Sequence, residues 1–284
     1  MTDPKWARPT DKGRYYEDPK TGDLLVSVTN VLDSLAIRGL APSAADLTAR
    51  YVMDNIVEAS QVAAETEARE EFIKRAKRHY EDEWERRMNL GSAIHAAAEA
   101  HVLGGQQRPI SPLVAPFLAQ YLKFLDDYQV DLNTDVEAVE NTVLHRGRHY
   151  GGTADLWVHL TLPPPHPSGL WLLDLKSSVK KPASVVYPQQ PLQLAALRNA
   201  EVALNPYDQD KPIPKFVGAA ILNLRPWAYG LIPVDADHNA YRAFVSLLPT
   251  VQWLHGWSPS PYKPINTGWR KPRNWDKKHK EVAA

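Results

Sequence analysis

Hydrophobic and polar positions divide the chain into a helical first part and a strand-rich second part. Residues 14–28 predict a hairpin, because apolar segments flank the turn sequence DPKTG. From residue 29 to 88 the pattern is helical, with an interruption near Gly39 and Pro42. We therefore expect a small hairpin followed by a helical N-terminal region.

The pattern changes near residue 135. Segments 135–145, 150–160 and 170–176 are short, rich in Val, Leu, Thr and Trp, and separated by RGRHYGG and PPPHPSG. They predict three consecutive antiparallel strands. The other expected elements are helices at 89–103, 112–128, 188–204 and 237–254, and strands at 215–224 and 228–234.

This order of elements predicts an α/β (α+β) fold, with a central mixed sheet flanked by helices. We divide the chain into an N-terminal hairpin and helical region at 1–88, a core at 89–256 and a basic C-terminal tail at 257–284.

Composition narrows the classes of function. The formal net charge of the 284 residues is +0, so nucleic-acid binding would depend on local patches. The absence of Cys excludes disulfides, thiolate zinc sites, iron–sulfur clusters and cysteine nucleophiles, so any metal must bind to oxygen and imidazole. We find no signal peptide and no membrane-spanning run, and we expect a cytoplasmic protein with no membrane partner.

Two acidic residues in neighbouring predicted strands are the main candidates for chemistry. Asp174 and Lys176 share one face of their strand, and a simple ion pair would explain those two alone. Asp155 lies in the preceding strand, and two carboxylates that meet repel each other unless a proton or a cation lies between them. Such paired oxygens suit Mg²⁺ or Mn²⁺.

The helix predicted at 89–103 supplies an imidazole. His95 and Glu99 are four residues apart and share a face surrounded by Ala. A lone helical His is more often a packing residue than a ligand. An imidazole ligand would shift the preference of a site toward Mn²⁺.

Four short motifs occur in a specific order: GSAIH at 91–95, GGTAD at 151–155, DLK at 174–176 and QLAAL at 193–197. Together they resemble the PD-(D/E)xK nuclease superfamily, which has a restriction-endonuclease-like core. The RecB-like exonucleases, including the CRISPR-associated and phage-encoded members, are the most similar group. The stretch YYEDPKTGDLLVSVTNVLDSL also resembles the N-terminal region of phage-encoded members.

The resemblance implies a role for each matched residue. The implied cation ligands are His95, Asp155, Asp174 and the main-chain carbonyl of Leu175. Asp155 and Asp174 would thereby be catalytic, Lys176 would orient or deprotonate the attacking water, and Gln193 would position Lys176 or the phosphate. Many relatives have a Tyr four residues after the Gln; this chain has Leu197 there, and Tyr187 is a candidate replacement.

The function implied is a divalent-metal-dependent DNA exonuclease that acts at DNA ends in recombination or repair, phage-encoded and with a recombination protein as a possible partner. The alternatives are a structure-specific endonuclease of the same fold and a non-catalytic nucleic-acid-binding module. No GxxxxGK[ST] loop is present, so no ATPase motor is expected. Cleavage polarity, strand preference and oligomeric state stay open.

Cations near the predicted strands are candidates for DNA contact. They are Arg146, Arg148, Lys180 and Lys181, to which Tyr187 and the basic tail from Lys263 are added. A solvated loop would explain the two Lys equally well. Three further acids have open roles, as partners of Arg146 or Arg148 or as ligands of a second metal: Glu99, Glu137 and Glu140.

Overall fold

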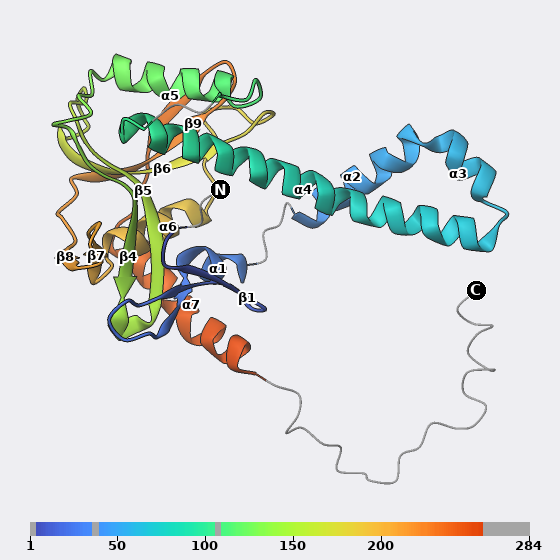
Figure 1. Cartoon of the computed structure of the whole chain (residues 1–284), viewed down its shortest axis with the longest axis horizontal. Coiled ribbons are helices and arrows are strands. Elements are labelled where there is room, and N and C mark those ends of the chain that lie inside the picture. The colour runs from blue at the N-terminus through green and yellow to red at the C-terminus, as the bar shows by residue number, and fades with distance from the viewer. Residues whose placement is uncertain (1–3, 36–39, 106–108, 258–284) are drawn as a thin grey trace, which may run out of the picture.

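The structure is a computed structural model that describes residues 4–35, 40–105 and 109–257 (Figure 1). The basic tail predicted from the sequence therefore lies outside the described residues, except for Trp257.

The described residues contain ten strands joined in one mixed sheet. The strands are β1 (Ala7–Thr10), β2 (Gly13–Glu17), β3 (Leu24–Ser27), β4 (Val136–His145), β5 (Tyr150–Leu160), β6 (Gly169–Ser177), β7 (Val202–Leu204), β8 (Asp210–Pro212), β9 (Gly218–Leu224) and β10 (Tyr229–Pro233). Pairs β3–β5 and β6–β9 are parallel and the others are antiparallel. The predicted mixed sheet is thereby confirmed, while the assignment to a restriction-endonuclease-like core stays a prediction.

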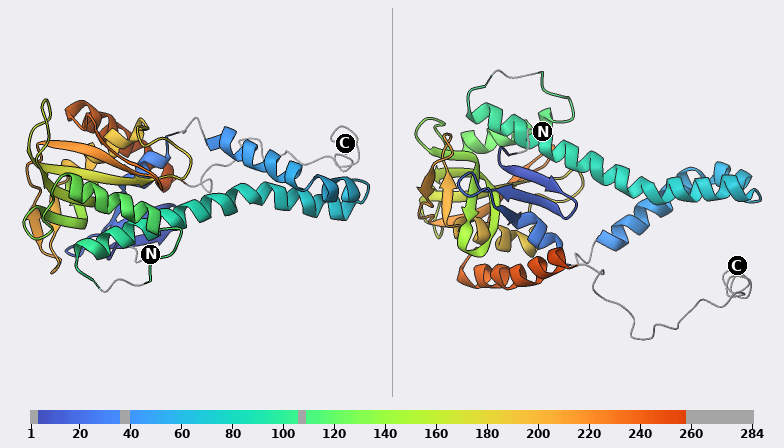
Figure 2. Two further views of the ribbon diagram at one scale, coloured as in Figure 1. Left: turned by 90° about the horizontal axis from the view of Figure 1, so that it is seen from above. Right: turned by 60° about the horizontal axis from the view of Figure 1, so that its bottom comes forward.

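Helices cover both faces of this sheet (Figures 1 and 2). Their bounds are α1 (Val28–Asp33), α2 (Leu40–Asp54), α3 (Ile56–Val62), α4 (Thr66–Val102), α5 (Ala115–Asp127), α6 (Gln189–Arg198) and α7 (His238–Gly256). One apolar core joins the sheet to α1, α6 and α7 through residues such as Leu172, Leu194 and Phe244. A second core joins the other face to α4 and α5 through Ile94, Phe117 and Leu173.

The longest helix, α4, extends beyond the sheet. Its C-terminal part packs on the core through Ile94 and Ala98, whereas its N-terminal part continues outward and packs against α2 and α3. Figures 1 and 2 show the resulting arm, which projects from one side of the sheet. Phe72 and Ala76 are buried in this arm.

The predicted start of a helix at residue 89 is wrong. Residues 66–102 form one continuous helix, so the predicted division between residues 88 and 89 crosses α4. The hairpin assigned to residues 1–88 also belongs to the main sheet, because Val26 and Ser27 of β3 pair with Tyr150 and Gly151 of β5.

The three strands predicted at 135–145, 150–160 and 170–176 are confirmed as β4, β5 and β6, in antiparallel order. The helix predicted at 188–204 ends earlier, at Arg198, because β7 pairs with β4 from residue 202. Strands β1 and β8 were not predicted. Among the described residues, we find no helix with the length and apolar character needed to cross a membrane.

Candidate metal centre

The candidate site forms where strands β5 and β6 separate. Their pairing runs from Leu160↔Gly169 to Leu156↔Leu173 and ends there, while β6 stays paired to β9 as far as Ser177. Because β5 pairs with β3 from Gly151 backwards, the segment between Gly151 and Leu156 faces a fork in the sheet. We call the group of side chains at this point the fork site: His95, Glu140, Asp155, Asp174, Leu175, Lys176 and Gln193.

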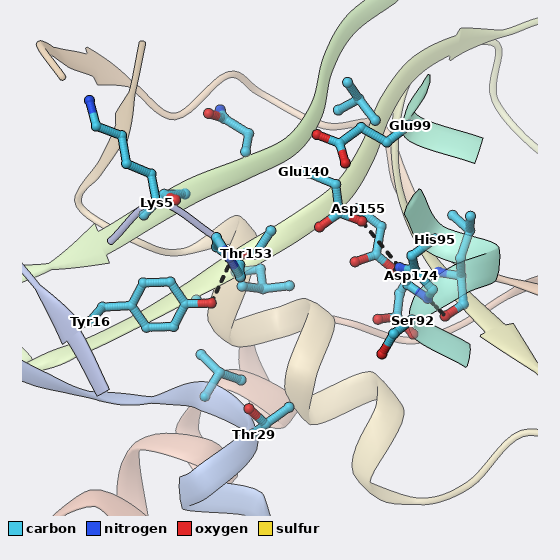
Figure 3. A pocket seen from close by; sticks show the side chains of 18 of the residues that line it. Lys5, Tyr16, Thr29, Ser92, His95, Glu99, Glu140, Thr153, Asp155 and Asp174 are labelled. Atoms are coloured by element: carbon cyan, nitrogen blue, oxygen red, sulfur yellow. Dashed lines mark hydrogen bonds and ion pairs between the residues drawn. The ribbon is translucent and has the colours of Figure 1, made fainter. Parts of the chain in front are cut away.

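One half of the fork site gathers an imidazole and two carboxylates. Nδ1 of His95, on α4, lies 3.1 Å from Oε1 of Glu140 and 3.8 Å from Oδ2 of Asp155. These three residues offer ligand atoms that all lie within 4.8 Å of one another. Figure 3 shows Glu140 and Asp155 converging on His95 from neighbouring strands.

The other half of the fork site holds the Asp-x-Lys pair. Nζ of Lys176 lies 2.8 Å from Oδ1 and 2.7 Å from Oδ2 of Asp174. Nε2 of Gln193, on α6, donates a hydrogen bond of 2.8 Å to the same Oδ1. Oδ2 of Asp174 is buried and has no partner of hydrogen-bond geometry in the described part of the chain. Gln193 was expected to position Lys176 or a phosphate, and it binds the same oxygen of Asp174 as Lys176 does.

The backbone of Leu175 links the two halves. Its N–H donates a hydrogen bond of 2.6 Å to Oδ2 of Asp155, and its carbonyl oxygen lies 3.1 Å from Nε2 of His95. Both groups are available because β5 no longer pairs with β6 at this residue. The carbonyl of Leu175, which is predicted as a cation ligand, thus lies beside the imidazole of His95.

Glu140 adopts an unusual backbone conformation for a strand residue. It lies opposite Asp155, between the pairs Val139↔Leu156 and Asn141↔Ala154, and its φ is 46°. This left-handed conformation costs a residue other than Gly about 1–3 kcal/mol, and such strain is concentrated at functional sites. The antiparallel register could have identified Glu140 from the sequence, because residues opposite each other share a face.

The charges of the fork site shift one another's pKa values. Burial alone would lower the pKa of His95, but the carboxylates of Asp155 and Glu140 outweigh it and raise the pKa to about 9. Burial raises the pKa of Asp174 to about 6 against the opposing effect of Lys176, and burial also raises the pKa of Asp155. Burial would lower the pKa of Lys176, but Asp174 and Asp155 raise it.

These shifts define the state of the site without a cation. A protonated His95 can donate from Nδ1 to Glu140 and from Nε2 to the carbonyl of Leu175, whereas either neutral tautomer would leave one lone pair facing an oxygen. The imidazolium of His95 thus supplies the positive charge between the carboxylates of Glu140 and Asp155.

Arg146 was predicted to contact DNA, and the structure places it in a different cluster. Its guanidinium donates two hydrogen bonds to Asp18, at 2.6 and 3.0 Å, and two to Asp210, both at 2.9 Å. We call these three residues the Arg146 cluster. The bonds to Arg146 lower the pKa of both carboxyl groups.

The other predicted DNA contacts also lie outside the cavity at the fork site. Arg148 stacks over Tyr241 of α7, with its guanidinium carbon 5.9 Å from the ring centroid. Lys180 and Lys181 are exposed in the loop after β6, and Tyr187 is 40% exposed in the turn before α6. Neither Glu137 nor Glu140 pairs with Arg146 or Arg148: Glu137 lies 2.9 Å from His159, and Glu140 contacts His95.

A cavity of about 960 Å³ extends from the fork site toward the N-terminal hairpin. Sequence analysis did not assign three cationic residues that line it: Lys5, Arg14 and Arg87. These residues lie outside the four motifs in the sequence, and no local sequence pattern marks them as part of the site. Glu99 also lines the cavity, one turn after His95.

Comparisons with known proteins add little to this description. The sequence matches no family model and no curated protein. Sixteen chains of solved structures match it. One of these solved structures, "Crystal structure of SSO0001", is 14% identical, with 82% of this chain and 76% of that chain covered and a TM-score of 0.29. At that TM-score the likeness carries no argument about function.

Proposed function

We propose that the protein is a divalent-metal-dependent DNA nuclease that hydrolyses phosphodiester bonds, with the exonuclease activity at DNA ends that the sequence motifs imply. One observation carries the proposal: His95, Glu140 and Asp155 converge within 4.8 Å of one another, and Leu175 connects them to the Asp174–Lys176 pair. An acid-rich centre can hold a cation that activates water for phosphodiester hydrolysis, and an adjacent ammonium can offset the charge of the phosphate.

The fork site fits a small divalent cation. Ligands at about 2.1 Å from one cation lie at most about 4.2 Å apart, and Nδ1 of His95 is within that range of both Glu140 and Asp155. In the neutral tautomer Nε2 would donate to the carbonyl of Leu175, which leaves the Nδ1 lone pair for the cation. Mg²⁺ accepts the carboxylates, and the imidazole favours Mn²⁺.

The residues of the fork site divide the work. A bound cation would supply a hydroxide at neutral pH and offset the negative charge of the phosphate. The raised pKa of Lys176 keeps its side chain protonated at neutral pH, so it orients the attacking water and stabilises the phosphate rather than accepting a proton. Asp174, fixed by Gln193, holds Lys176 in place, because both of its carboxylate oxygens lie within 2.8 Å of the ammonium.

The motifs imply a biological setting that the geometry does not address. As expected from the sequence, we propose a role in recombination or repair of DNA, in a phage-encoded protein that acts beside a recombination protein.

A degradation assay tests the proposed function. Linear single- and double-stranded DNA, labelled at either end, is compared with covalently closed circles in Mg²⁺ or Mn²⁺. We expect loss of linear DNA, no loss in EDTA, and survival of the circles. If the circles are cut, the exonuclease hypothesis is wrong and the endonuclease alternative is favoured.

Two variants make the assay specific. Asp174→Asn and Lys176→Ala should each lower the rate by a factor of about 10²–10⁴, the usual contribution of a positioned catalytic group. Thermal unfolding and circular dichroism serve as the control for folding. Full activity of either folded variant would exclude this site as the nuclease centre.

A further inference from the structure

The cavity at the fork site is larger than a metal centre needs. Beyond His95 and Asp155 it continues between α4 and the N-terminal hairpin, as far as the loop between β7 and β8. We call this continuation the hairpin channel. Figure 3 shows Tyr16, Thr153 and Lys5 along it, on the side of the cavity away from His95.

The floor of the hairpin channel begins beside the metal centre. Thr153 precedes Asp155 by two residues on β5, and its Oγ1 lies 2.8 Å from the hydroxyl of Tyr16 on β2. The side chain of Tyr16 is buried, so this contact fixes its hydroxyl at the floor. Arg14 lies two residues before Tyr16 on the same face of β2 and lines the cavity. The floor thereby places a guanidinium in the channel.

Helix α4 forms the opposite wall. Arg87 precedes His95 by eight residues, which is about 12 Å along the helix axis and places both on one face. Arg87 lines the cavity and its side chain is 49% exposed, with Glu83 at 4.0 Å. Between them lies Gly91, where an added Cβ would meet only Oγ of Ser177, at 3.6 Å. Along this wall the guanidinium of Arg87 is therefore followed by the space beside Gly91 and then by the imidazole of His95.

The hairpin channel suits an elongated polyanion. A cavity of about 960 Å³ is at the upper end of the range of roughly 300–1,000 Å³ for small-ligand pockets. That volume holds a few nucleotides of one strand but not both strands of a duplex. Arg14, on β2, and Arg87, on α4, line the cavity from two different walls, so they are the candidates for phosphate contacts.

We propose that the hairpin channel binds a single strand of nucleic acid next to the bond to be cleaved, with Arg14 and Arg87 as phosphate contacts on opposite walls. This inference rests on the proposed function. It replaces the DNA contacts expected from the sequence at Arg146 and Arg148, which lie outside the cavity.

Binding to a labelled single-stranded oligonucleotide tests the channel. The full chain carrying Asp174→Asn is the parent, so that the oligonucleotide is not degraded, and fluorescence anisotropy is measured over a range of salt concentrations. Arg14→Gln or Arg87→Gln should weaken binding by about fivefold to tenfold and lower the salt slope by about 0.7, the value for one lost phosphate contact on a single strand.

Arg78→Gln is the matched control, because Arg78 is an exposed arginine of the same helix that does not line the cavity. Its affinity and salt slope should equal those of the parent. A blunt duplex of the same length should bind more weakly than the single strand, and equal binding would contradict the single-stranded occupant.

Two failures remain distinguishable. If the parent binds no DNA at any salt concentration, the proposed function fails and the inference fails with it. If the parent binds tightly but Arg14→Gln and Arg87→Gln bind equally well, only the channel is wrong. Weaker binding of Lys180→Gln and Lys181→Gln in that case would place the strand over the loop after β6.

Discussion

Two partly buried clusters of charge lie on the same sheet, and the pKa values of their carboxyl groups shift in opposite directions. In the Arg146 cluster one guanidinium makes four hydrogen bonds to two carboxylates, and both carboxyl pKa values are lowered. In the fork site burial raises the pKa values of Asp155 and Asp174, although Nζ of Lys176 lies 2.7 Å from Oδ2 of Asp174.

The difference separates a cluster that stabilises the fold from one that can bind a ligand. Ionised carboxylates with lowered pKa values favour the folded state, since folding improves their environment. Carboxylates with raised pKa values are poorly compensated, and such groups in a cavity are characteristic of functional sites. The strained φ of Glu140 at the fork site adds to this contrast.

The largest effect is expected from breaking the Arg146 cluster. Arg146→Met leaves Asp18, which is 1% exposed, without its cationic partner. Removing one partner of a buried ion pair costs about 3–5 kcal/mol of unfolding free energy, which urea denaturation measures. Nuclease activity per folded molecule should be retained.

Arg148→Met is the control, because the side chain of Arg148 is exposed and its guanidinium stacks over the ring of Tyr241. Its unfolding free energy should change by less than about 0.5 kcal/mol. Equal losses in the two variants would remove the contrast between the Arg146 cluster and its surroundings.

A smaller effect is expected from removing one charge at the fork site. Glu140→Gln should weaken Mn²⁺ binding by at least about tenfold, or about 1.4 kcal/mol, because Glu140 faces the Nδ1 side of His95 where we place the cation. Isothermal titration calorimetry measures the affinity directly, without any nuclease assay.

Glu137→Gln is the matched control on the same strand, since Glu137 contacts His159 and lies outside the cavity. Its Mn²⁺ affinity should be that of the natural chain. An unchanged affinity in Glu140→Gln would leave the metal to the ligands predicted from the sequence, Asp174 and the carbonyl of Leu175 included.

The last effect concerns pH in the absence of metal. The pKa of His95 rises from 6.5 in the unfolded chain to about 9 in the folded one. The resulting stabilisation is fully present below about pH 6.5 and is lost as the pH rises through about 9. In EDTA, the unfolding free energy of the natural chain should fall over this interval, and His95→Gln should show less of the fall.

An NMR titration of the His95 ring measures its pKa directly in the folded protein. A midpoint near 6.5 in EDTA would show that the two carboxylates do not hold the imidazolium. Saturating Mg²⁺ should displace the proton and lower the midpoint, since a ligand histidine is neutral.

Local patterns determined the elements that carry the motifs. Alternating apolar residues and turn sequences identified β4, β5 and β6 and their antiparallel order, because strand faces and short connections are properties of neighbouring residues. The same alternation correctly placed Asp174 and Lys176 on one face. The start of a helix at 89 was wrong, because residues 66–102 form one continuous helix.

Only the tertiary structure decided which charges meet. Arg146 is separated from its partners Asp18 and Asp210 by 128 and 64 residues, and no local pattern reports such distant pairs. The fork between β5 and β6 frees the backbone of Leu175, and it arises because β5 pairs with β3 at Gly151 while β6 continues along β9 as far as Ser177. The sequence by itself therefore determined the residue types available for chemistry. Long-range strand pairing decided that His95, Glu140 and Asp155 lie together and that Arg14 and Arg87 line the cavity beside them.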